Sequence, residues 1–155
     1  MMLLPLIPNA LLIAAGAFAS WSDTFHRRIP NWLSAATAVA GLITGFLLGG
    51  LPALGSQAAH AAIALIVGML LFRIGLFGGG DAKFYAAVAA WFRLAQATML
   101  LVYVTLCGLA VLVVWFVLRR IQGKPIRQRS NKPGDSLPYG IAIAGGAIAA
   151  LFMIS

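Results

Sequence analysis

Residues 97–118 read ATMLLVYVTLCGLAVLVVWFVL, twenty-two residues in a row without a charged side chain. A helix that crosses the hydrocarbon core of a bilayer needs about 20 predominantly apolar residues, and this run has that length. It lies in a chain of 155 residues that is 62% hydrophobic and only 9% charged. An ordinary soluble domain carries roughly 25% charged residues, so the composition excludes both a soluble domain and a disordered chain. We expect an all-α, polytopic membrane protein with one integral-membrane domain over residues 1–155.

The other apolar stretches of the chain are separated by polar, glycine-containing or proline-containing segments. A tight turn at 93–98 separates it from a shorter apolar stretch, and Pro52 with Gly55 predicts a loop over 51–58. Small residues at four-residue spacing predict close helix packing: Gly41, Gly45 and Gly49 in one segment, and Ala142, Gly146 and Ala150 in the last. The six predicted transmembrane helices cover residues 3–21, 32–50, 59–77, 82–92, 97–118 and 139–154.

The basic residues predict the orientation of these helices. The net charge is +8, but six of the eleven Lys and Arg residues lie within 119–132, which is typical of a cytoplasmic loop that faces lipid headgroups. With both termini outside the cytoplasm, ten of the eleven lie on the cytoplasmic side and only Arg93 on the other. We therefore expect membrane lipid and not nucleic acid as a partner. The short 82–92 segment must cross the membrane for this arrangement to hold.

Carboxylates are scarce in this chain, which contains no Glu and only the acids Asp23, Asp81 and Asp135. The predicted topology places all three at the cytoplasmic ends of their segments. Asp81 follows Gly78-Gly79-Gly80, a run that we expect to unwind the helix at this point. Asp135 is expected to be a loop acid or an acid at a helix N-terminus.

Two facing carboxylates can share one proton, so that one acts as general base on a water and the other as general acid. This chemistry hydrolyses a peptide bond without a metal. The chain has a single Cys107, and His26 and His60 are predicted on opposite membrane faces, so we expect no metal and no cofactor.

Three motifs resemble those of the type IV prepilin and preflagellin peptidases, the GxGD aspartyl proteases. Gly78-Gly79-Gly80-Asp81 with Lys83 resembles the GxGD motif, and Asp23 followed by Ile29-Pro30-Asn31 resembles the first aspartate motif. Residues 137–140, Leu-Pro-Tyr-Gly, resemble the Pro-Tyr-Gly entry into the last helix. The motifs occur in the family order.

The resemblance implies a bacterial inner-membrane aspartic endopeptidase that cuts the leader from prepilins or pseudopilins at the cytoplasmic face. It implies Asp23 and Asp81 as the catalytic pair. The chain lacks the paired CxxC motifs of larger members, so the short TadV/CpaA-like form of Flp-type pilus systems, without a methyltransferase domain, is the expected subgroup.

Other assignments stay open at this stage. Gly78, Gly80, Lys83 and Asn31 are candidate supporting residues, although Lys83 is equally well an interfacial lysine and Asn31 an N-cap or turn residue. A small proton-coupled transporter and a pilus or secretion assembly subunit without catalysis are the alternatives. The transporter predicts acids near the bilayer midplane, and the assembly subunit predicts that Asp23 and Asp81 can be replaced without loss of function. Neither alternative gives a reason for three glycines directly before Asp81.

Overall fold

The computed structural model describes residues 6–26, 28–123 and 139–154, and most of these residues are helical. No strand occurs in these ranges, and the predicted all-α class is confirmed. The elements are α1 (Leu6–His26), α2 (Asn31–Arg73), α3 (Gly79–Ala89), the 3-10 turn η1 (Leu94–Gln96), α4 (Ala97–Ile121) and α5 (Tyr139–Ile154).

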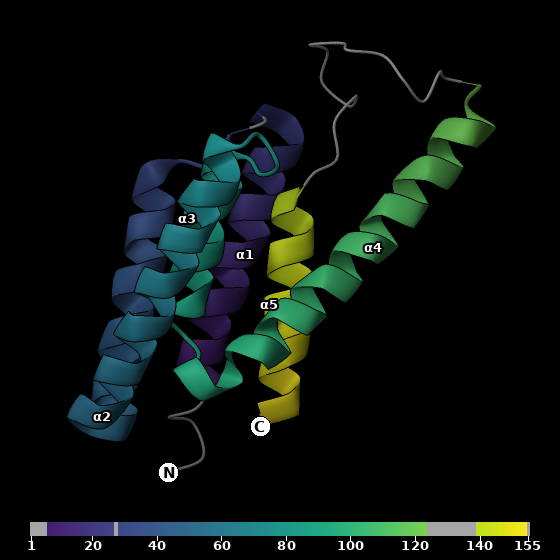
Figure 1. Ribbon diagram of the computed structural model, residues 1–155. Coiled ribbons are helices and arrows are strands. Elements are labelled where there is room, and N and C mark those ends of the chain that lie inside the picture. Colours follow the sequence, from purple (N-terminus) through teal and green to yellow (C-terminus); the bar gives the residue numbers. More distant parts are fainter. Residues whose placement is uncertain (1–5, 27, 124–138, 155) are drawn as a thin grey trace.

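Helix α2 is bent sharply at Gly50, whose φ of 65° and ψ of −162° are not helical. Its two halves fold back on each other (Figure 1), so that a Cβ on Gly45 would overlap the side chain of Gln57. The predicted loop over 51–58 is wrong, because the helix resumes at Leu51. Pro52 lies in the first turn of the second half, where a missing N–H breaks no helical hydrogen bond.

The short helix α3 lies in the centre of the packing. Phe84, Val88 and Ala89 of α3 are fully buried at 0% exposure, as is Phe92 in the turn that follows, and α3 packs against α2 and α5. The sequence predicted this segment over 82–92, but it begins at Gly79. Neighbouring helices therefore cover α3 along most of its length.

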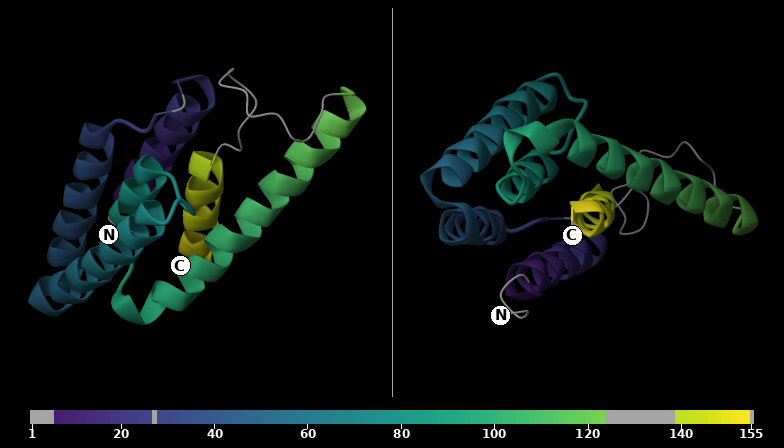
Figure 2. Two further views of the ribbon diagram at one scale, coloured as in Figure 1. Left: turned by 45° about the horizontal axis from the view of Figure 1, so that its top comes forward. Right: turned by 90° about the horizontal axis from the view of Figure 1, so that it is seen from below.

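Helix α5 lies between α1 and α4, as the two views of Figure 2 show. Small residues permit this contact, since a Cβ on Gly16 would lie 3.0 Å from Ala144 and one on Gly146 would overlap the backbone of Val104. The predicted packing face of α5 is confirmed, because Ala142, Gly146 and Ala150 are buried. Helix α4 contacts α5 near its start and then leaves the bundle (Figure 1).

The described helices expose many large apolar side chains, including Leu47, Leu51, Leu106 and Ile121. Two stretches are long and apolar enough to cross a membrane, Asn31–Arg73 and Leu94–Ile121, and α5 is a shorter apolar helix. The six crossings and their sidedness stay predictions.

One end of the bundle collects several helix termini, including the end of α2, which directly precedes α3. Helix α1 ends there, and α2, α3 and α5 begin there, at the top of Figure 1. Asp23 and Asp81 both lie at this end, in the last turn of α1 and the first turn of α3. Asp135 lies outside the described residues.

Candidate active site

The partly buried Asp23 meets the beginning of α5. Its Oδ2 accepts a hydrogen bond of 2.8 Å from the backbone N–H of Gly140. The first amides of a helix have no partner within the helix and carry partial positive charge, so this contact stabilises a negative charge on Asp23. A Cβ on residue 140 would lie 3.0 Å from the Cβ and Oδ2 of Asp23, so only glycine lets the two helices approach this closely.

The segment that joins α1 to α2 is held against the site. Ser22 Oγ donates a hydrogen bond of 2.7 Å to the backbone oxygen of Arg28, and Ile29 is buried. Pro30 is the N-cap of α2, so the expectation that Asn31 caps this helix is wrong. Pro30 serves as N-cap with its fixed φ of −61° and an extended ψ of 137°.

A Schellman turn ends α2 and aims the chain at Asp81. The N–H of Leu76 donates to the oxygen of Leu71 and that of Gly75 to the oxygen of Phe72, both at 3.0 Å. Gly75 has a φ of 79°, which favours glycine. The helix is therefore unwound by Gly75, and the expectation that Gly78-Gly79-Gly80 unwinds it is wrong.

These glycines instead begin α3, with Gly78 as N-cap and Gly79 and Gly80 in the first turn. The Asp81 side chain folds back over Gly78, where a Cβ would overlap its carboxylate. At Gly80 a Cβ would meet Ile29 at an ordinary 3.8 Å. The two glycines of the motif thus differ: the position of Asp81 requires glycine at residue 78, whereas residue 80 has room for a methyl group.

Asp23 and Asp81 line one cavity of about 470 Å³, so two carboxylates from different helices face the same space. Burial, and to a smaller extent the negative charge of Asp23, together raise the pKa of Asp81 from its ordinary 3.8 to about 6. Asp81 lies outside both stretches that are long and apolar enough to span a membrane. The remaining lining comes from Arg28, Ile29, Pro30, Asn31, Gly78, Gly79 and Gly80.

Lys83 does not line this cavity. Its Nζ donates a hydrogen bond of 3.0 Å to Asn31 Oδ1, which ties the start of α3 to the start of α2. Asn31 does line the cavity, so Lys83 acts on it only through Asn31. Among the described residues, no three His, Cys, Asp or Glu side chains come together.

Sequence reasoning did not select Gly140 as a site residue, nor Arg28, Ile29, Pro30 and Gly79 of the cavity lining. Gly140 holds Asp23 through its backbone N–H, and the signal for it was the Pro-Tyr-Gly motif at the beginning of the last helix. A glycine at a helix start indicates a position where another part of the chain can approach the backbone closely.

One comparison with known proteins identifies a family. The family model described as the type IV leader peptidase family matches residues 10–113, a range that contains Asp23, Asp81 and all of α3. Comparison with curated proteins and with solved structures found no significant match.

Proposed function

The chain belongs to the type IV leader peptidase family and is therefore a membrane-embedded peptidase, and from this premise we propose that Asp23 and Asp81 are its catalytic pair. The observation that carries the proposal is the shared cavity, into which α1 and α3 each bring one carboxylate. The enzyme is then an aspartic endopeptidase that activates water directly. Family membership favours this function over a transporter or a non-catalytic assembly subunit.

The two carboxylates have different roles in this mechanism. Asp23, which receives the Gly140 N–H, is the ionised general base and takes a proton from the water that attacks the peptide carbonyl carbon. Asp81, whose pKa is raised, gives its proton to the carbonyl oxygen, which forms a neutral tetrahedral diol. The C–N bond then breaks, the leaving nitrogen receives the proton held by Asp23, and a diol hydroxyl returns its proton to Asp81.

The proposed substrate is a prepilin or pseudopilin of the Flp type, cut between its basic leader and its apolar helix. We place the site at the cytoplasmic face of a bacterial inner membrane, with both chain termini on the other side. The charge distribution supports this orientation, because Arg28, Arg73 and Lys83 gather toward the end with the carboxylates and Arg93 lies at the start of η1. The peptidase forms one domain over residues 1–155.

Cleavage of a co-expressed Flp-type prepilin tests the proposal. Asp23→Asn and Asp81→Asn each remove a group that must ionise while keeping its size, so each should abolish the size shift of the substrate. Asp135→Asn is the matched control and should cleave at the rate of the unmodified enzyme. Equal membrane levels of all variants are checked by immunoblot. Normal cleavage by either of the first two variants would contradict the assignment of the pair.

A further inference from the structure

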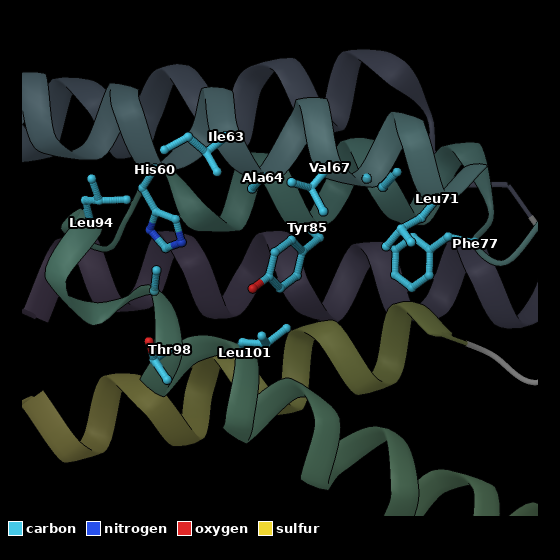
Figure 3. Close-up of a pocket in the computed structure, with 13 residues that line it drawn as sticks. His60, Ile63, Ala64, Val67, Leu71, Phe77, Tyr85, Leu94, Thr98 and Leu101 are labelled. Atoms are coloured by element: carbon cyan, nitrogen blue, oxygen red, sulfur yellow. The ribbon is translucent and has the colours of Figure 1, made fainter. Parts of the chain in front are cut away.

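A second cavity, of about 330 Å³, lies between the second half of α2, α3 and the beginning of α4. Figure 3 shows its walls: Val67 and Leu71 of α2 on one side, Leu101 of α4 on the other, and Tyr85 of α3 between them. We call this cavity the α3–α4 groove. Its lining is apolar apart from His60, Tyr85 and Thr98, and the ring Nδ1 of His60 already faces the backbone oxygen of Phe92 at 3.0 Å.

The groove is open because α4 packs on α5 and diverges from α3 (Figure 1). Within the described part of α4, only Leu100 and Arg119 are buried. Val67 and Leu101, which face each other across the groove, are 49% and 55% exposed. No described helix of this chain covers them.

One end of the groove adjoins the candidate active site. Phe77 and Ala82 line the groove, and the residues between them, Gly78 to Asp81, line the cavity of the carboxylates. The α2 wall extends from His60 to Leu71, which at 1.5 Å per residue is about 17 Å, or three helical turns. An apolar helix lying there would begin beside Asp81.

We propose that the α3–α4 groove receives the apolar helix of the substrate, in the turns that directly follow the scissile bond. The inference rests on the proposed function and adds the surface that selects the substrate. A substrate bound there is helical along the groove and becomes extended where it reaches Gly78–Asp81. At that point its scissile peptide bond meets both carboxylates. Substrate selection then depends on apolar contact along the groove as well as on the residues at the cut.

Another groove lies on the opposite side of α3 and is lined largely by alanines, together with Leu65, Lys83 and Asn31. At its end near the site, the hydrogen bond of 3.0 Å between Lys83 and Asn31 stands between the groove and the carboxylates. A substrate entering that way would have to displace this pair. The α3–α4 groove has only Phe77 and the glycine segment at the same point, so it is the better path.

Three consecutive residues of α2 lie on different surfaces, so cysteines at these positions can report where the substrate helix binds. Val67 lines the α3–α4 groove, Leu65 lines the alanine groove, and Ile66, at 61% exposure, lines neither. Single cysteines at each position, in full-length protein carrying Cys107→Ala and Asp81→Asn, are oxidised in membranes with a prepilin that has one cysteine in its apolar helix. We expect a disulfide-linked product at least tenfold stronger from Val67→Cys than from Leu65→Cys or Ile66→Cys. A stronger product from Leu65→Cys, equal products from all three, or no product would overturn the inference.

Cleavage by the active enzyme provides the second measurement. Val67→Trp fills the groove and should slow prepilin cleavage at least tenfold, whereas Ile66→Trp should stay within twofold of the unmodified enzyme. If the unmodified enzyme cleaves and both tryptophan variants cleave equally well, the groove inference fails and the proposed function stands. If the unmodified enzyme leaves the prepilin intact, the proposed function fails and the inference with it. If Val67→Trp does not reach the membrane, the cysteine experiment decides.

Discussion

Asp23 lies in the last turn of α1, next to the first turn of α5. Asp81 lies in the first turn of α3, shortly after the turn at the end of α2. The backbone N–H of Gly140 favours the ionised form of Asp23, whereas burial disfavours the ionised form of Asp81. The two aspartates therefore face the same cavity, but Asp23 favours the ionised form and Asp81 favours the protonated form. An acid–base pair needs this difference, and the fold produces it through the elements behind each residue.

The largest expected difference concerns the two glycines before Asp81. Gly78→Ala places a methyl group where the Asp81 carboxylate lies, and displacing a reacting group by about 1 Å can cost about 100-fold in rate. Gly80→Ala meets only Ile29 at 3.8 Å and should reduce the rate by no more than about threefold. Initial rates of prepilin cleavage compare the two variants at equal protein level. Equal losses would show that Asp81 is not positioned in this way.

The protonation of Asp81 should appear in the pH dependence of cleavage. Burial and the charge of Asp23 raise the pKa of Asp81 to about 6, so the carboxyl keeps its proton below that pH and loses it as the pH rises. Because a general acid must hold its proton, kcat/KM should fall about tenfold per pH unit above this value. Asp135→Asn should show the same falling limb. A rate that is constant from pH 5 to 8 would contradict the role of Asp81 as the acid.

A smaller effect is expected on the Asp23 side. Gly140→Ala would place a Cβ 3.0 Å from Asp23 and push the helix N–H away, which removes one hydrogen bond to a charged group. We expect kcat/KM to fall about tenfold. Gly108→Ala is the control, since its Cβ would meet Ala142 at an ordinary 3.7 Å in the contact between α4 and α5. If Gly140→Ala cleaves as fast as Gly108→Ala, the N–H of Gly140 does not support Asp23.

The smallest effect is expected on stability. Ser22→Ala removes the hydrogen bond of 2.7 Å to the Arg28 oxygen and should lower the free energy of unfolding by about 1 kcal/mol. Thr24→Ala, which removes an exposed hydrogen bond to Ser20 in the same helix, should change it by no more than about 0.5 kcal/mol. Thermal unfolding of the detergent-solubilised variants measures both. A larger loss for Thr24→Ala would mean that the segment after α1 is held by other contacts.

Much of this arrangement could be predicted from the sequence, because apolar runs and small-residue spacing report directly on helices and their contacts. The common location of Asp23 and Asp81 followed from the topology that the Lys and Arg residues predict. The bend at Gly50 was predicted as a loop, since Pro52 and Gly55 give the same local signal in a loop and in a first helical turn. The stop at Gly75 was missed for a similar reason: the glycine run at 78–80 is the stronger signal, but among these four glycines only Gly75 has a positive φ.

The contacts across helices could not be predicted in this way. The hydrogen bond from Gly140 to Asp23 joins residues 117 positions apart, and a pattern within one segment carries no information about such a pair. The hydrogen bond from Lys83 to Asn31 also depends on the geometry of the bend in α2 at Gly50.

A double-mutant cycle most directly tests the claim that Asp23 and Asp81 act as one unit. The cleavage rates of Asp23→Asn, Asp81→Asn and the double variant are compared in the same membranes with a sensitive assay of the released leader. Residues that work as a unit in catalysis are strongly non-additive. We predict that the double variant is no slower than the slower single variant. A double variant whose loss is the product of the two single losses would show that the two carboxylates act independently and would contradict the shared site.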